Sequence, residues 1–107
     1  MRYYISGAIT GQHNYRKFFK DHIKSLKYYG LEGEIFDPTS VKWPKSAAWE
    51  DCMKYDIQKL MDCDCLILLP NWEGSKGVEV ELYLCKKLGI EVKEFRMLMG
   101  ELMNDAS

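Results

Sequence analysis

Residues 62–70 read Asp-Cys-Asp-Cys-Leu-Ile-Leu-Leu-Pro, and this stretch decides the fold class of the 107-residue chain. The run from Cys63 to Leu69 is almost continuously apolar, and Asp62 and Pro70 bound it. Such a short apolar run is typical of a strand buried on both faces, because helices cover both sides of a parallel sheet. We therefore expect a central parallel strand here.

The segments on either side of this run alternate between strand and helix patterns. The expected elements are a strand at 2–6, a helix at 14–29, a strand at 34–36, helices at 49–61 and 75–88, and a strand at 90–92. Asn14 is the expected N-cap of the first helix, and Gly30 is expected to end it. The resulting β-α-β-α-β-α-β order predicts an α/β fold with a doubly wound parallel sheet of four to five strands. The last strand is expected at an edge, because Ile90 and Val92 alternate with charged residues.

The length of the chain fits one domain with a single core. We expect an α/β domain over residues 1–93 and an amphipathic, helical tail over residues 94–107. The apolar residues of this tail that recur at helical spacing are Phe95, Leu98, Met99, Leu102 and Met103. The pattern leaves open whether the tail packs on the domain or makes a contact between subunits.

Charge and composition exclude several classes of function. The chain has 15 basic and 16 acidic residues, a net charge of −1 and no basic stripe, which argues against a nucleic-acid polymer as partner. No apolar run approaches the roughly 20 residues of a membrane span, and the start lacks a signal-peptide pattern, so we expect a soluble, cytoplasmic protein. The four cysteines lack the paired spacing of a zinc site, so we expect them to fill the core, with no metal and no cofactor.

Two acidic residues occupy positions where a soluble helix is expected to be apolar. On the helix at 75–88, Glu81 falls in the middle of the apolar arc, and on the helix at 49–61, Asp56 falls inside the apolar stripe. A carboxylate on a core-facing stripe is costly unless it is partnered or lies at a cleft. Each acid alone is explained by a structural hydrogen bond, but the two together indicate a pair for acid, base or nucleophilic chemistry.

The loops that leave the first and third strands are the expected ligand-binding segments. In doubly wound sheets, ligands bind at the carboxyl ends of the strands where the winding direction reverses. The residues expected to offer backbone N–H groups or a hydroxyl to a phosphate or a sugar are Gly7, Ala8, Ile9, Thr10, Ser75 and Gly77. A plain tight turn at residues 7–11 is an equally good interpretation.

Three further side chains are candidates with two interpretations each. Asn71 and Trp72 lie just past the third strand, where the indole would either cover a planar base or pack against its own loop. Tyr4, on the first strand, would either donate a hydrogen bond to a carboxylate or serve only as core.

Three blocks of the sequence resemble motifs of the nucleoside 2-deoxyribosyltransferase superfamily. The first is Tyr4-Ile5-Ser6-Gly7-Ala8-Ile9-Thr10-Gly11, and the second is Trp49-Glu50-Asp51-Cys52-Met53-Lys54-Tyr55-Asp56, continuing through Leu60-Met61-Asp62-Cys63-Asp64. The third is Leu69-Pro70-Asn71-Trp72-Glu73-Gly74-Ser75-Lys76-Gly77-Val78-Glu79-Val80-Glu81, which looks like the family's Ser-x-Gly-x-x-x-Glu signature. Order and spacing hold from about residue 1 to residue 93. The resemblance is to small members of the superfamily and to its deoxynucleoside 5′-monophosphate N-glycosidases.

This resemblance implies a flavodoxin-like (Rossmann-like) fold and cleavage or transfer at the N-glycosidic bond of a (deoxy)nucleoside or its 5′-monophosphate. Glu81 takes the position of the family's nucleophile, Asp56 that of its second carboxylate and Tyr4 that of its strand tyrosine. A covalent glycosyl intermediate on Glu81 would be resolved by water or by a second base. We expect no cofactor. The family often completes its site with C-terminal residues of a neighbouring subunit, so the resemblance also implies a homo-oligomer.

The chain departs from the family pattern at two places that support an alternative function. Ala8 and Thr10 replace a serine and an arginine that monophosphate-cleaving members often carry in the first loop. Tyr83 stands where a glycine is common, two residues after the nucleophile position, and would crowd the helix or the pocket. The alternative is a non-catalytic nucleoside- or nucleotide-binding protein on the same fold.

Overall fold

The computed structural model describes the backbone of residues 1–106 and the side chains of residues 1–104. Its elements, in chain order, are β1 (Arg2–Ser6), α1 (Tyr15–Tyr28), β2 (Glu34–Phe36), a short 3₁₀ helix η1 (Pro38–Ser40), α2 (Trp49–Met61), β3 (Cys65–Leu68), α3 (Lys76–Leu88), β4 (Glu91–Glu94) and α4 (Phe95–Ala106). None of the helices in this part of the chain is long and apolar enough to span a membrane.

The four strands form one parallel sheet in the order β2-β1-β3-β4. The prediction of an α/β fold with a doubly wound, flavodoxin-like parallel sheet is confirmed, with four strands. β1 and β3 are the central pair, with Tyr4 opposite Leu66 and Ser6 opposite Leu68. After β2 the chain crosses over β1 to reach β3, so the winding direction reverses between the two central strands.

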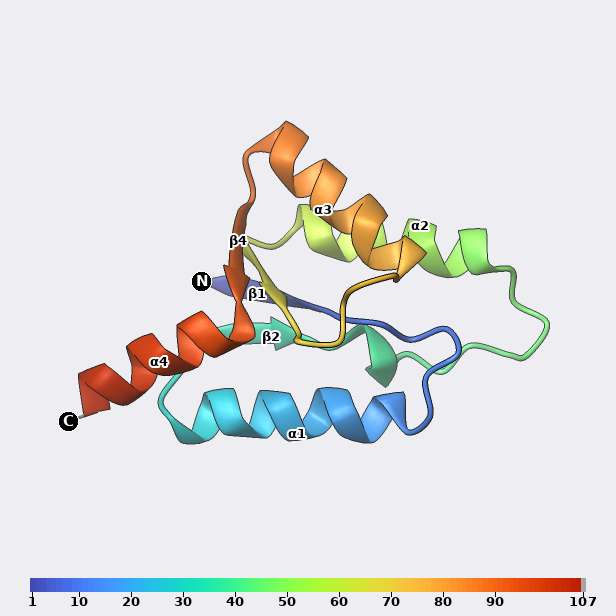
Figure 1. Ribbon diagram of the computed structural model, residues 1–107. Helices are drawn as coiled ribbons and strands as arrows, with labels where there is room; N and C mark the ends of the chain where they lie inside the picture. Colours follow the sequence, from blue (N-terminus) through green and yellow to red (C-terminus); the bar gives the residue numbers. More distant parts are fainter. Residues whose placement is uncertain (107) are drawn as a thin grey trace.

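Helices cover both faces of the sheet, with α1 and α4 on one side and α2 and α3 on the other (Figure 1). Successive side chains of a strand point to opposite faces. Tyr3 and Ile5 therefore pack with α1 and α4, whereas Tyr4 and Ser6 point toward α2 and α3. This alternation brings two hydroxyl groups of β1 to the face where both acidic residues lie.

Each face of the sheet has its own apolar core. The buried residues on the α1 and α4 side are Tyr3, Ile5, Phe19, Ile23, Leu26, Cys65, Ile67, Leu69 and Leu98. Those on the α2 and α3 side are Tyr4, Leu60, Leu66, Leu68, Val78 and Cys85. The β3 residues 65–68 are buried without exception, as expected for its apolar sequence. Cys65 and Cys85 fill the core as free thiols.

Three local features differ from the sequence-based expectation. Asn14 directly precedes α1 but has a left-handed backbone (φ 55°) and makes no capping hydrogen bond with its side chain. β3 begins at Cys65, since the N–H of Cys63 still bonds to Leu60 O at the end of α2. β4 begins one residue late because the N–H of Ile90 is used to close α3, bonding to Cys85 O.

Gly33 is a position that the fold restricts to glycine. Its φ is +119°, and a Cβ atom there would lie 2.3 Å from the carbonyl oxygen of Met1. That oxygen accepts a hydrogen bond from the N–H of Glu34, where the β1–β2 pairing begins. A side chain at residue 33 would therefore strain the backbone and push apart the first pair of the sheet edge.

We predict that Gly33→Ala lowers the free energy of unfolding by about 2 kcal/mol or more. Gly100→Ala is the matched control, because Gly100 is exposed in the helix α4 and an added Cβ would meet nothing within 4 Å. This control should raise stability by roughly 0.5–1 kcal/mol through helix propensity. Urea unfolding of both variants measures the two values, and equal effects would contradict the role given to Gly33.

Candidate active site

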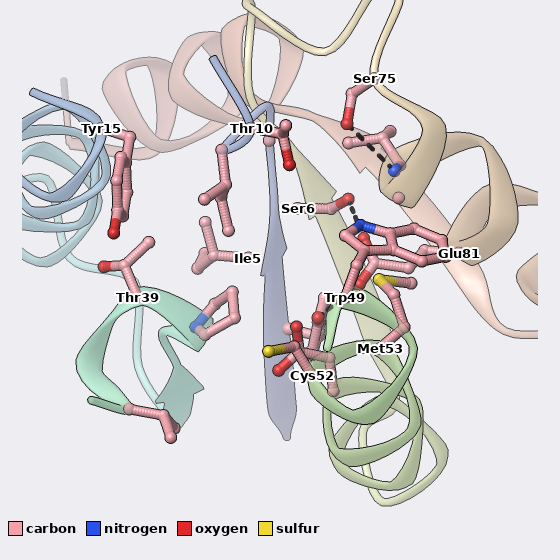
Figure 2. Close-up of a pocket in the computed structure, with 18 of the residues that line it drawn as sticks. Ile5, Ser6, Thr10, Tyr15, Thr39, Trp49, Cys52, Met53, Ser75 and Glu81 are labelled. Carbon is pink, nitrogen blue, oxygen red and sulfur yellow. Dashed lines mark hydrogen bonds between the residues drawn. The ribbon is translucent and has the colours of Figure 1, made fainter. Parts of the chain in front are cut away.

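A cavity of about 250 Å³ lies at the carboxyl ends of β1 and β2 and is lined by residues of α1, η1, α2 and α3. Figure 2 shows its walls, with Tyr15 and Thr39 on one side and Trp49, Met53 and Glu81 on the other. The lining residues are Tyr4, Ile5, Ser6, Gly7, Ile9, Thr10, Tyr15, Arg16, Pro38, Thr39, Val41, Trp43, Trp49, Cys52, Met53, Asp56, Ser75, Gly77, Val78 and Glu81.

Glu81 is held in the cavity wall by two hydroxyl groups of β1. It lies on the buried stripe of α3 between Val78 and Cys85, at helical spacing of i, i+3 and i+7, and is only 5% exposed. The phenol of Tyr4 donates a hydrogen bond to its Oε2, and Ser6 Oγ donates to its Oε1 over 2.7 Å. Both carboxylate oxygens are thus fixed by donors, which is the arrangement that suits an ionised group.

Asp56 occupies the equivalent position on the neighbouring helix but is not held in the same way. It lies between Met53 and Leu60 on the buried stripe of α2, again at i, i+3 and i+7, and is 8% exposed. Its Oδ1 atom is fully buried and has no hydrogen-bond partner among the described residues. A buried carboxyl oxygen without a hydrogen-bond partner is costly. Asp56 lines the same cavity as Glu81.

Burial raises the pKa of both carboxyl groups. For Glu81 the pKa rises to about 7, because burial and the nearby charge of Asp56 outweigh the hydrogen bonds from Tyr4 and Ser6, which lower it. For Asp56 burial alone raises the pKa to about 6. The phenol pKa of Tyr4 is raised by burial and by the Glu81 charge, so this hydroxyl remains a donor. Both carboxyl groups therefore titrate close to neutral pH.

The loop after β1 and the start of α3 form the adjoining wall. Gly7, Ile9 and Thr10 line the cavity from the loop, and Ser75 and Gly77 line it from the helix. Ser75 caps α3 through its Oγ, which accepts from the N–H of Val78 at 3.3 Å. Gly7 is fitted closely, because an added Cβ would lie 3.0 Å from Asn71 Oδ1.

Ala8, Asn71 and Trp72 were expected to contact a ligand, and the structure places all three outside the cavity lining. Ala8 is buried, and its N–H donates to Asn71 Oδ1 at 3.3 Å, while Asn71 Nδ2 donates to Ala8 O at 3.5 Å. Asn71 thereby ties the loop after β1 to the loop after β3. Trp72 packs against the core under α3 and lines a separate cavity of about 170 Å³ beside Phe95.

Several lining residues were not among the predicted site residues. Ser6 shares the face of Tyr4 because it is two residues further along β1, a signal that the sequence does contain. Trp49 lies at the start of α2, where Lys76 Nζ is 4.4 Å from the centre of its ring and joins the starts of α2 and α3. Arg16 and Thr39 come from α1 and η1, and only the path of the chain after β2 brings them together. Tyr83 is 60% exposed and does not line the cavity, so it crowds no ligand there.

The geometry supplies one carboxyl group fixed through both oxygens and a second, less restrained carboxyl group, and both residues line the same cavity. Such a pair suits nucleophilic attack together with proton transfer. Among the residues that the structure describes, no group of three or more histidine, cysteine, aspartate and glutamate side chains is placed to hold a metal ion.

Residues 1–94 match the family model described as a domain of unknown function, DUF4406. The chain belongs to the DUF4406 family. A solved structure of a 2-deoxyribosyltransferase from the psychrotolerant bacterium Bacillus psychrosaccharolyticus is similar to this DUF4406 chain, with a TM-score of 0.65 over 88% of this chain and 71% of the other. At 17% identity this likeness shows a shared fold, which agrees with the resemblance read from the three motifs. No curated protein matches the chain.

We predict that Asp56→Asn stabilises the protein at pH 8 but not at pH 4. The pKa of Asp56 is raised from 3.8 to about 6 on folding, so its contribution to stability falls as pH rises from about 4 to about 6. Above that range the full cost of burying the charge is present. Removing the charge of Asp56 should therefore raise the free energy of unfolding by about 1–2 kcal/mol after allowance for solvent screening.

Asp51→Asn is the matched control for this measurement. Asp51 is exposed in the first turn of α2, where a negative charge interacts favourably with the helix dipole. Its replacement should leave stability at pH 8 unchanged or slightly lower. Urea unfolding at both pH values tests the pair, and a gain for Asp56→Asn that is equal at pH 4 and pH 8 would contradict the account given for its carboxyl group.

Proposed function

We propose that this protein cleaves or transfers at the N-glycosidic bond of a (deoxy)nucleoside or its 5′-monophosphate, with Glu81 as the nucleophile. The observation that carries the proposal is the Glu81 carboxylate, buried in the wall of a cavity and fixed through both oxygens by Tyr4 and Ser6. The 2-deoxyribosyltransferase of the same fold supports the choice of a nucleoside as substrate.

The proposed reaction proceeds in two displacements. An oxygen of Glu81 attacks the anomeric carbon of the sugar, and the bond from this carbon to the base nitrogen breaks, with its electron pair leaving on the base. The base takes up a proton, and the sugar remains as an ester on Glu81. In the second step, water or a second base attacks the same carbon and releases the Glu81 carboxylate. Water makes the protein a hydrolase, and a second base makes it a transferase.

The other polar groups have separate roles in this mechanism. Tyr4 and Ser6 hold Glu81 in one orientation and favour its ionised form, because each donates to a carboxylate oxygen. Asp56, which lines the same cavity, hydrogen-bonds the sugar or delivers the proton to the departing base. Burial raises the pKa of Asp56 to about 6, so Asp56 carries a proton mainly at slightly acidic pH.

The loop after β1 and the start of α3 make the remaining contacts with the sugar. Backbone N–H groups at Gly7, Ile9 and Thr10, with Ser75 and Gly77, offer hydrogen bonds to a hydroxyl or phosphate at the 5′ position. Since none of the described side chains of α4 lines the cavity, we assign the activity to the domain of residues 1–93. The homo-oligomer implied by the superfamily remains a prediction.

We predict that Glu81→Gln lowers the rate of base release by at least about 1,000-fold, because an amide cannot form the glycosyl ester. Free base would be quantified by chromatography after incubation with ribo- and deoxyribonucleosides and their 5′-monophosphates, with and without an acceptor base. Glu79→Gln is the matched control, because Glu79 is an exposed residue on the same helix and should leave the rate unchanged.

Dependence of base release on the acceptor base distinguishes a transferase from a hydrolase. Equal rates for wild type and Glu81→Gln would remove Glu81 from the role of nucleophile. If folded wild-type protein released no base from any of these substrates, the proposal of catalysis would fail, and the non-catalytic binding protein would become the better description of the cavity.

A further inference from the structure

The end of the cavity farthest from Glu81 has a composition of its own. Figure 2 shows Tyr15 and Thr39 across the cavity from Trp49 and Glu81, with Ile5 and Thr10 between them. The apolar and aromatic residues that line the cavity from α1, η1 and the following loop are Tyr15, Pro38, Val41 and Trp43. We call this end of the cavity the slot, and its aromatic and apolar side chains suit the faces of a nucleobase.

Arg16 is the basic residue among the lining residues; it is exposed, one hydrogen bond engages its Nε, and its other donors are free. Its Nε donates to the carbonyl oxygen of Thr39 at 3.4 Å, and its guanidinium lies 5.0 Å from the centre of the Tyr15 ring. None of the described acidic side chains pairs with it, and no described residue accepts from its two terminal nitrogens. Four N–H donors of a planar fork are therefore available at the rim of the slot.

Thr39 places an acceptor next to these donors. It is 4% exposed, and its hydroxyl donates to Asp37 Oδ1 at 2.7 Å, while its own N–H donates to the same oxygen at 2.8 Å. Because the hydroxyl proton is used in this way, the lone pairs of Thr39 Oγ1 are the part of the group that can still bind a ligand. Both residues line the slot, Arg16 with free N–H donors and Thr39 with an acceptor oxygen.

We infer that this end of the cavity recognises a 6-oxopurine base through Arg16 and Thr39. A 6-oxopurine carries two adjacent acceptors, N7 and O6, followed by an N1–H donor, which matches the fork of Arg16 and the lone pairs of Thr39 Oγ1. Adenine carries a donor at position 6 and an acceptor at N1. Its amino group would therefore meet the donors of Arg16, and its N1 would meet the acceptor of Thr39. This inference rests on the proposed function, because the base is placed relative to a sugar at Glu81.

The same contact favours departure of the base. As the glycosidic bond breaks, negative charge develops on the base, and a cation at its O6 and N7 edge stabilises that charge more than it stabilises the intact nucleoside. Arg16 therefore contributes to turnover of 6-oxopurine nucleosides as well as to their binding.

The test compares 2′-deoxyinosine with 2′-deoxyadenosine, which differ at position 6 and in the protonation of N1. Wild type should favour 2′-deoxyinosine in kcat/KM by roughly 5- to 150-fold, the range of one bidentate arginine–base contact. Arg16→Met should abolish this preference, mainly by lowering kcat/KM for 2′-deoxyinosine, and Arg16→Lys should restore little of it, because lysine lacks the fork. Lys20→Met, an exposed residue of α1 outside the cavity lining, is the control and should change neither substrate.

Two additional measurements separate this inference from its competitors. If Arg16→Met instead lowered activity on both 5′-monophosphates equally and left both nucleosides unchanged, Arg16 would be a phosphate ligand and the inference would be overturned. Calorimetric binding of free hypoxanthine and adenine tests the slot without turnover. Preference for hypoxanthine that is lost in Arg16→Met supports the slot even if no substrate is cleaved. Turnover with equal kcat/KM for both nucleosides overturns it and leaves the proposed function intact.

Discussion

The buried carboxylate of Glu81, bonded to the hydroxyls of Tyr4 and Ser6, is the constraint on which the rest of the site depends. An ionised group removed from water is costly unless hydrogen bonds replace those that water would make. Here both replacements come from β1, so the carboxylate joins α3 to the central strand of the sheet. The stripe of α3 that carries Glu81 also carries Val78 and Cys85 into the core, so apolar packing and hydrogen bonding set the same rotation of the helix.

Glu81 and Asp56 hold equivalent positions on their helices, but their hydrogen-bond partners differ. Glu81 accepts two hydrogen bonds, whereas Asp56 keeps a buried oxygen without a partner. Hydrogen bonds to the charged form favour ionisation, and burial without them favours the protonated form. The two carboxyl groups of the cavity therefore differ in how firmly they are held, since the strand fixes Glu81 through both oxygens and leaves Asp56 with one oxygen unpaired.

Much of the fold and the centre of the site could be predicted from the sequence, because both follow from local patterns. The apolar run that forms β3 predicted the parallel sheet. The helical spacing of apolar residues showed that Glu81 and Asp56 lie on the buried stripes of their helices. Arg16 and Thr39 could not be found in this way, since their meeting depends on the irregular path after β2. The sequence could not predict which way the Trp72 side chain points either, because a loop has no regular periodicity that places its residues on one face.

The alternation of β1 has a consequence for how this protein can change in evolution. Tyr4 and Ser6 serve Glu81 only because their positions have the same parity, while Tyr3 and Ile5 serve the opposite core. Insertion or deletion of a single residue within the strand would exchange the two sets and present aliphatic groups to the carboxylate. A substitution in β1 keeps the alternation of its side chains between the two faces, whereas a change in the length of the strand does not. Relatives that keep the buried glutamate should therefore preserve the spacing Tyr-x-Ser even where the surrounding residues differ.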